Sequence, residues 1–229
     1  MSIKTDLIQP LLNWLYPAAC LLCDGKLSES ERMICDSCWT KLPRAVDQSI
    51  QHLWLAREKK SSIYLDDFYA CFHFDDSVQK IVHGLKYEGK TKLAKEIIQA
   101  TLPEILKYPQ LSACDWIIPV PLHPKKKKSR GFNQSLLLAS ELGHFLAIPI
   151  AESILIRRKF TASQTKLDAK ARMENVAEAF EVIKPEVVQN THVLLLDDLI
   201  TTGATVNECA RVLKAAGAKK VLALAIARP

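Results

Sequence analysis

The sequence predicts an α/β fold, in which helices flank a parallel sheet and a small metal-binding module comes first. Apolar segments with strand character alternate with helical segments along most of the chain, the pattern of a parallel sheet covered on both faces. Two Cys-x2-Cys pairs precede them. A chain of 229 residues is long enough for both parts. We therefore expect the metal module over residues 1–45, a connection over 46–62 and the α/β domain over 63–229.

The N-terminal module begins with residues 1–18, whose apolar side chains recur at helical spacing and predict a short amphipathic helix. The cysteines that follow are Cys20, Cys23, Cys35 and Cys38. Two thiolates in one Cys-x2-Cys pair can share a metal ion, and two pairs make a tetrahedral four-sulfur site that suits zinc. Disulfides or an iron–sulfur cluster are the alternatives. Because all four ligands are cysteines, the site has no open position, and we expect a structural zinc.

The first half of the α/β domain is expected to contain two strands, each followed by a helix. Residues 68–74 alternate like a strand, and Asp75 or Asp76 caps the next helix. Residues 115–122 are typical of a buried strand that runs into a proline-bounded loop, which continues through the run of four lysines. A helix is then expected from about Asn133 to Phe145.

The second half begins with a short strand over residues 154–156, followed by a polar loop. The chain ends in a β-α-β unit, whose strands cover residues 192–196 and 221–227. Gly203 precedes the helix between them, and Gly217 marks its C-cap. Three further cysteines stand alone in apolar segments and are expected in the core, namely Cys71, Cys114 and Cys209.

The net charge of +6 is concentrated in one region. Residues 121–172 contain eleven Lys or Arg and three acids, so the remainder of the chain is slightly acidic. This distribution predicts that the region contacts an anion; a solvated basic surface is the alternative. No segment reaches the roughly 18 apolar residues of a membrane span, and the N-terminus lacks a secretory pattern. We therefore expect a cytoplasmic protein, whose cysteines do not form a disulfide framework.

Two adjacent acids, Asp197 and Asp198, end the strand in the sequence VLLLDDLITTGAT. Ligands of parallel sheets bind at the carboxyl ends of the strands, where these acids lie. The small residues after them precede a helix, and their backbone N–H groups can bind an anion there. A sugar phosphate suits both features, because carboxylates accept hydrogen bonds from hydroxyl groups while the amides hold the phosphate. The lysine of a Walker loop is missing after Gly203.

The stretch VLLLDDLITTGAT closely resembles the phosphoribosyl pyrophosphate (PRPP) loop of type I phosphoribosyltransferases. Nearly the whole chain resembles the narrower ComF/ComFC/GntX family, whose members are competence-associated and phosphoribosyltransferase-like. The resemblance rests on residues 119–134, residues 157–176 and the four-cysteine module. It implies a type I phosphoribosyltransferase-like sheet with an N-terminal zinc module. It also implies roles for residues after the strand: Asp197 and Asp198 bind the ribose hydroxyls, and Thr201, Thr202, Gly203, Ala204 and Thr205 hold the 5′-phosphate.

The same resemblance makes PLHPKKKK the pyrophosphate-binding loop and residues 157–166 a mobile loop that closes over PRPP. Basic side chains and Mg2+ stabilise the departing pyrophosphate. The candidate catalytic residues are Asp197, Asp198, Arg157 and Lys159. The candidate PRPP-binding cations are Lys125 and Lys126. The candidate nucleic-acid contacts are Lys126, Lys127, Lys128, Arg130 and Arg158.

Two other positions bear on the ligand. Purine salvage enzymes for hypoxanthine and guanine carry an acid where this chain has Thr201, so we do not expect those substrates. The stretch VHGLKYEGK also recurs in the ComF-type family, and Lys86 within it can reach a phosphate or lie exposed on a helix.

The resemblance favours a PRPP- and Mg2+-binding, phosphoribosyltransferase-like protein that acts in natural competence and handles imported single-stranded DNA in the cytoplasm. An active phosphoribosyltransferase of nucleotide metabolism with an unidentified acceptor is the alternative. A second alternative is a non-catalytic adaptor that binds proteins of the DNA-uptake or translocation machinery.

Overall fold

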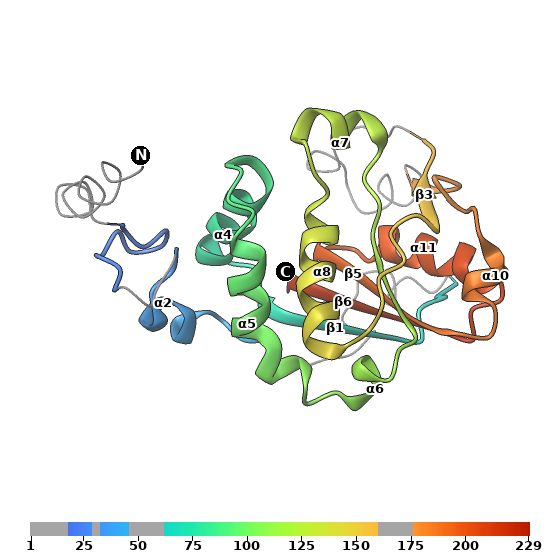
Figure 1. The fold of residues 1–229 in the computed structure, drawn as a ribbon, viewed down its shortest axis with the longest axis horizontal. Coiled ribbons are helices and arrows are strands. Elements are labelled where there is room, and N and C mark those ends of the chain that lie inside the picture. The colour runs from blue at the N-terminus through green and yellow to red at the C-terminus, as the bar shows by residue number, and fades with distance from the viewer. Residues whose placement is uncertain (1–17, 29–32, 46–61, 160–175) are drawn as a thin grey trace, which may run out of the picture.

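A four-stranded parallel sheet forms the centre of the computed structural model, which describes residues 18–28, 33–45, 62–159 and 176–229 (Figure 1). The strand order is β1-β6-β5-β2, and each neighbouring pair is parallel. The strands are β1 (Asp67–His73), β2 (Trp116–Pro119), β5 (His192–Leu199) and β6 (Lys220–Arg228). The predicted helix over residues 1–18 and most of the predicted connection lie outside the described residues.

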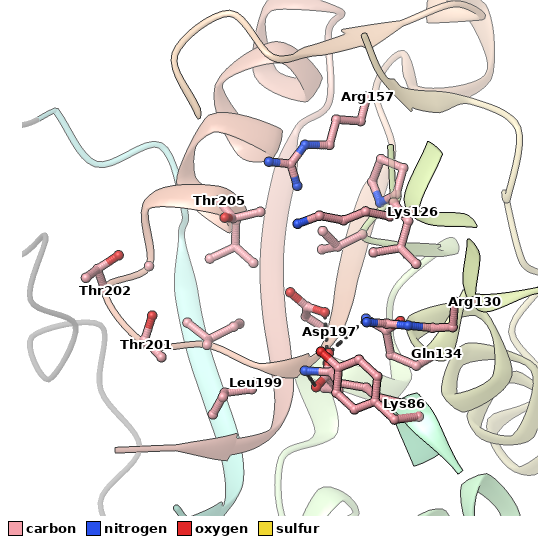
Figure 2. A pocket seen from close by; sticks show the side chains of 18 residues that line it. Lys86, Lys126, Arg130, Gln134, Arg157, Asp197, Leu199, Thr201, Thr202 and Thr205 are labelled. Carbon is pink, nitrogen blue, oxygen red and sulfur yellow. Dashed lines mark hydrogen bonds and ion pairs between the residues drawn. The ribbon is translucent and has the colours of Figure 1, made fainter. Parts of the chain in front are cut away.

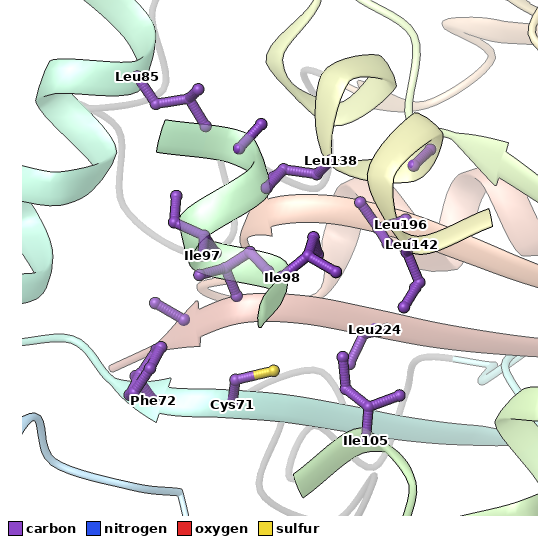
Figure 3. Packing of buried hydrophobic residues seen from close by; sticks show 14 of the residues in the cluster. Cys71, Phe72, Leu85, Ile97, Ile98, Ile105, Leu138, Leu142, Leu196 and Leu224 are labelled. Carbon is purple, nitrogen blue, oxygen red and sulfur yellow. The ribbon is translucent and has the colours of Figure 1, made fainter. Parts of the chain in front are cut away.

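Alternate side chains of the central strands enter two separate apolar layers. On one face, Leu194, Leu196 and Leu224 pack against α4 (Asp76–Tyr87), α5 (Leu93–Ile105) and α8 (Gln134–Leu146) (Figure 3). On the other face, Val193 and Leu195 pack against α11 (Ala204–Ala215) and α10 (Pro185–Val188). Because both faces are covered, β5 and β6 are almost continuously apolar, as expected for central parallel strands.

Helix starts follow the capping signals in the sequence. The carboxylate of Asp75 accepts a hydrogen bond from Val78 N at 2.8 Å, and the side chain of Asn133 accepts one from Ser135 N at 3.1 Å. At the end of α11 the C-cap is Ala216, one residue before the predicted Gly217, which follows in the left-handed conformation with φ 97°. Cys71, Cys114 and Cys209 are buried, as predicted.

Residues 124–130 form a helix, so the prediction of a loop through the lysine run was wrong. Helix α7 (Pro124–Arg130) begins with proline at its first turn, where the missing N–H costs no hydrogen bond. The ring of His123 accepts a hydrogen bond from Lys125 N, and Gly131 ends the helix with φ 89°. The capping interactions at its two ends therefore stabilise this helix, because the lysine run has no apolar side chain that could pack into the core.

The short strand near residue 155 lies outside the main sheet. Strand β3 (Leu155–Arg157) pairs antiparallel with β4 (Phe180–Val182), which the sequence pattern did not reveal. The small sheet packs on the α11 side of the core. The remaining short helices are α2 (Asp36–Lys41) and α6 (Pro109–Ser112). Within the described ranges, no helix has the length and apolar character needed to cross a membrane.

The cysteine module is packed into the α4–α5 side of the core. Cys20, Leu27 and Ile34 are buried within the same apolar cluster as these helices. Met33 N donates a hydrogen bond to the buried Glu96 carboxylate of α5 at 3.3 Å. Figure 1 shows α4 and α5 between this module and the central sheet. The module and the α/β domain therefore share one apolar core.

Candidate functional site

A cavity of about 210 Å3 lies at the carboxyl ends of β2 and β5, as predicted for a ligand site of a parallel sheet (Figure 2). The residues that line it come from segments far apart in the sequence. Its polar and charged side chains are Lys86 and Tyr87 from α4, Lys126 and Arg130 from α7, Gln134 from α8, Arg157 from β3, Asp197 and Asp198 from β5, Thr201 and Thr202 from the β5–α11 segment, and Thr205 from the first turn of α11.

The two acids are held by the start of α8 and the end of α4. Ser135 Oγ donates to Asp197 Oδ1 at 2.8 Å, and Gln134 Nε2 donates to Asp198 Oδ1 at 3.0 Å. The ammonium group of Lys86 forms an ion pair with Asp198 Oδ2. The side chains of Lys86 and Asp198 are 18% and 4% exposed, so solvent screens this pair little. The acids therefore have fixed positions before any ligand binds.

Asn133 explains why α8 can reach the acids. Its side chain caps the helix and also donates a hydrogen bond from Nδ2 to the carbonyl of Val120 at 3.1 Å. The first turn of α8 is thereby tied to the segment that leaves β2, next to the end of β5. The positive end of the helix dipole also faces the carboxylates, which favours negative charge there.

Burial, and after it the neighbouring Asp198, raise the pKa of Asp197 to about 7 against the opposing effects of Lys86 and Ser135. A carboxyl group with this pKa exchanges its proton near neutral pH. It can therefore accept a hydrogen bond from a hydroxyl group, or release a proton, when a ligand changes the local charge.

The raised pKa predicts how stability depends on pH. The folded state keeps Asp197 protonated between about pH 4 and about pH 7, while the unfolded chain ionises it near its ordinary value. We therefore expect wild-type unfolding free energy to decrease across this range relative to that of Asp197→Asn. Urea denaturation of both proteins at several pH values measures the difference. Parallel stability curves would contradict the assignment.

The segment after β5 has the backbone features of an anion site. Gly203 adopts the left-handed conformation with φ 85° and forms the N-cap of α11, a helix of 12 residues. Ala204 N donates to Thr202 Oγ1 at 3.3 Å, and Asn207 Nδ2 donates to the carbonyl of Ser62 at 3.0 Å. Thr201, Thr202, Gly203 and Thr205 line the cavity, whereas Ala204 is buried beneath it. Helix N-termini bind anions through their free N–H groups and positive potential.

Basic side chains face this segment across the cavity. Figure 2 shows Lys126 and Arg157 directed into the same space, with Thr205 across from them. Arg157 is 9% exposed, and its guanidinium carbon lies 5.2 Å from the centre of the Phe180 ring. Among the described residues no carboxylate forms an ion pair with Lys126. Burial and the nearby cations Arg157, Arg130 and Lys86 lower the pKa of Lys126, so an anion at this place relieves repulsion.

The structure separates the remaining predicted cations from the cavity. Lys127 forms an ion pair with Glu152 at 3.1 Å, and Lys159 forms one with Glu178 at 3.1 Å. Arg158 pairs with Glu181. Lys125 and Lys128 are exposed on α7 and do not line the cavity. Helical geometry explains the division, since Lys126 and Arg130 are four residues apart and share one face of α7.

Sequence reasoning missed Gln134 and Ser135 as residues of the site. The only local signal was their position directly after Asn133, a residue typical of helix caps. Their contacts with Asp197 and Asp198 span 62 and 64 residues along the chain. The sequence predicts that Lys86 reaches a phosphate or lies exposed on a helix, and the structure instead pairs it with Asp198.

The cavity has an acidic side and a basic side. The acids can accept hydrogen bonds from hydroxyl groups or hold a divalent cation. The cations and the start of α11 can bind anionic groups and stabilise an anionic leaving group. A ligand that carries both hydroxyl and phosphate groups matches the arrangement.

The four cysteines of the N-terminal module form a second site. Their sulfur atoms all lie within 4.8 Å of one another, and Cys23 Sγ lies 3.8 Å from Cys35 Sγ. Tetrahedral zinc with Zn–S bonds of about 2.3 Å places its sulfur ligands roughly 3.8 Å apart, so this donor set fits zinc. The separation is far too long for a disulfide.

Backbone groups prepare Cys20 for metal binding. Burial alone would raise its pKa, but N–H groups, including those of Leu22 and Cys35, donate to Cys20 Sγ and lower the pKa to about 6. Such hydrogen bonds stabilise the thiolate form that binds metal. The cluster contributes four cysteine ligands and no open position, as the sequence predicted for a structural zinc site.

Comparisons with known proteins identify the same two parts. Residues 11–50 match the double zinc ribbon domain, and residues 133–229 match the phosphoribosyl transferase domain. DNA utilization protein YhgH of Salmonella typhimurium is 36% identical over 144 residues, which cover 62% of this chain and 63% of that protein. The match thus spans less than two thirds of YhgH.

Two further similarities concern longer stretches of the chain. Competence protein F of Haemophilus influenzae is 26% identical over 222 residues, which cover 91% of this chain and 96% of that protein. The solved structure of adenine phosphoribosyltransferase from Saccharomyces cerevisiae is 15% identical, with a TM-score of 0.38, over 68% of this chain and 76% of that one. The predicted fold class and family resemblance are confirmed by the matched domains and the homologues. The chain is similar to competence protein F over most of its length, and it joins an N-terminal segment that matches the double zinc ribbon domain to a segment that matches the phosphoribosyl transferase domain.

Proposed function

We propose that the cavity binds PRPP together with Mg2+. The observation that carries this proposal is the convergence, around one cavity, of the Asp197–Asp198 pair, the segment at the start of α11 and the cations Lys126 and Arg157. The acids accept hydrogen bonds from the ribose hydroxyls. The 5′-phosphate lies against Thr201, Thr202, Gly203 and Thr205, and the pyrophosphate lies toward Lys126 and Arg157.

The oxygen donors of the site suit Mg2+, which prefers carboxylate and phosphate oxygens. When bound, Mg2+ neutralises part of the pyrophosphate charge and favours its departure. Lys126 and Arg157 stabilise the charge that accumulates on the leaving group. Their partial burial strengthens this effect, because little water is present to screen it. Lys86 neutralises Asp198 in the ligand-free protein.

For the biological role, we propose that the protein acts in natural competence and handles single-stranded DNA in the cytoplasm. The names of the two relatives, competence protein F and DNA utilization protein, support this role. Lys125, Lys127 and Lys128 are exposed on α7, outside the cavity. They provide positive charge that the small PRPP molecule does not need, and a longer polyanion can use it.

Two variants of α7 separate these two ligands. We expect Lys126→Ala to weaken Mg-PRPP binding, while the Lys125→Ala/Lys127→Ala/Lys128→Ala variant retains it. The triple variant should instead flatten the slope of log K for single-stranded DNA against log salt by about 2, from roughly 0.7 per phosphate contact. Calorimetry and filter binding at several salt concentrations measure the two effects. Loss of PRPP binding in the triple variant, or an unchanged salt slope for DNA binding, would contradict the assignment of Lys126 to PRPP and of the three exposed lysines to DNA.

Catalysis of phosphoribosyl transfer is a second candidate function, favoured by the buried cations that face the expected leaving group. Release of pyrophosphate from Mg-PRPP in the presence of an acceptor tests it. Wild type should release pyrophosphate, and Arg157→Met should release much less, since one electrostatic contact to a developing charge contributes about 3 kcal/mol. Equal release by both proteins would remove Arg157 from the reaction.

A further inference from the structure

A second cavity, of about 420 Å3, adjoins the first and receives no role from PRPP. It is lined by Lys86, Tyr87, Gly89, Lys126, Ser129, Arg130 and Phe132. Four of these residues also line the first cavity, namely Lys86, Tyr87, Lys126 and Arg130. The two cavities therefore share a wall, and a molecule in the second lies next to the pyrophosphate-binding side of the first.

Tyr87 presents an aromatic ring to this second cavity. It lies in the last turn of α4 and is 66% exposed, so most of its side chain is accessible to a ligand. The guanidinium carbon of Arg130 lies 5.0 Å from the centre of the Tyr87 ring, and the ring of Phe132 contributes to the same lining. Aromatic rings and guanidinium planes are the surfaces on which planar ligands stack.

The charge of the second cavity has one sign. Its charged lining residues are Lys86, Lys126 and Arg130, all of which are cations. Lys86 forms an ion pair with Asp198, whereas burial, and after it repulsion from the nearby cations led by Arg157 and Arg130, lower the pKa of Lys126. A ligand that brings a negative group relieves this repulsion, and a neutral ring does not.

We propose that the second cavity binds a planar aromatic ring that carries an anionic group, with the ring on Tyr87 and the anion toward Lys126 and Arg130. The proposal deepens the proposed function, because the ring would lie beside PRPP. Two sources have this chemistry: a nucleotide within a single strand, and a free aromatic acid. Because the two cavities share a wall, either ligand would lie next to the anomeric carbon of PRPP or next to its pyrophosphate leaving group.

The test uses the full chain, with matched probes and matched variants, in the presence and absence of saturating Mg-PRPP. Oligodeoxythymidylate is compared with an abasic strand of the same length, which removes the ring and keeps the phosphates. Nicotinate is compared with nicotinamide, which keeps the ring and removes the charge. The variants are Tyr87→Leu, which removes the ring, and Tyr87→Phe, which keeps it. Phe132→Leu provides a second change in the same lining.

We expect wild type to bind oligodeoxythymidylate or nicotinate more tightly than its matched probe. Tyr87→Leu should weaken that binding by about 5- to 100-fold, the effect of one base–aromatic stack, and Tyr87→Phe should change it little. Which anionic probe binds identifies the source. Equal binding of matched probes, or an unchanged affinity in both Tyr87→Leu and Phe132→Leu, would overturn the proposal. If wild type fails to bind Mg-PRPP, the proposed function is refuted instead. The titrations without PRPP still test whether the second cavity binds an aromatic ring.

Discussion

Replacing Cys35 and Cys38 together with serine is expected to release the metal and to destabilise the whole chain. The first effect follows from the loss of two of four thiolate ligands, because structural zinc contributes about 10–16 kcal/mol of apparent binding free energy in small zinc-binding peptides. The second follows from the packing of the module, since Cys20, Leu27 and Ile34 belong to the apolar cluster that covers one face of the sheet. Metal analysis should show about one zinc per chain in wild type and a strong reduction in the variant.

Thermal unfolding distinguishes a local effect from a global one. We expect the midpoint of the main transition to fall, because the module packs directly on α4. The side chain of Leu21 lies against Gly84, 3.4 Å from the place that a Cβ atom would take there. Cys114→Ser is the matched control, since Cys114 is buried but lies outside the four-sulfur cluster. Full zinc retention in the Cys35→Ser/Cys38→Ser variant would contradict the metal site. An unchanged midpoint after zinc loss would contradict the shared core.

The Asp197→Asn/Asp198→Asn variant is expected to lose Mg-PRPP binding almost completely. Each hydrogen bond to a charged carboxylate contributes about 1.5–3 kcal/mol, so the pair should account for at least a 100-fold change in affinity. The same substitutions remove two carboxyl groups, and the negative charge that they carry, from a cavity that keeps Lys86, Lys126, Arg130 and Arg157. Binding of inorganic pyrophosphate should therefore persist or become tighter, because its contacts are on the basic side.

Titration calorimetry with the two ligands gives both results from one preparation of protein. Glu181→Gln serves as the control variant, because Glu181 pairs with Arg158 on the surface outside the cavity. Retained PRPP affinity in the double variant would mean that the acids do not contact the ribose. Loss of pyrophosphate binding as well would indicate that the variant no longer forms the cavity.

The parts of the site that could be predicted from sequence are those encoded by adjacent residues. The apolar run of β5, the two acids after it and the Gly203 turn lie within one short segment, and segment order alone places them at the edge of a parallel sheet. The two cysteine pairs were equally informative, because metal-ligand spacing is local. Capping residues such as Asp75 and Asn133 marked the helix starts for the same reason.

The lysine run was beyond such reasoning. Four adjacent lysines repel one another and show no apolar period, so their pattern does not predict a helix. The helix turns Lys126 and Arg130 toward the cavity and leaves Lys127 to pair with Glu152. The sequence therefore predicted a basic anion site, but it could not tell which of the lysines contributes.

Contacts between distant segments were also beyond prediction. Lys86 meets Asp198, and Ser135 meets Asp197, only because α4 and α8 cover the same face of the sheet. Helix α5 contains Pro103 in its interior and was not predicted. Tertiary packing determines which of several plausible polar residues reach the acids, and a single sequence contains no distances.

The crystal structure of the protein with PRPP and Mg2+ tests the central claim most directly. We expect a 5′-phosphate at Thr201, Thr202, Gly203 and Thr205, ribose hydroxyls at Asp197 and Asp198, and a pyrophosphate at Lys126 and Arg157. Lys86 should have moved away from Asp198 or should contact the ligand. A PRPP molecule bound elsewhere, or a cavity that stays empty at saturating ligand, would contradict it.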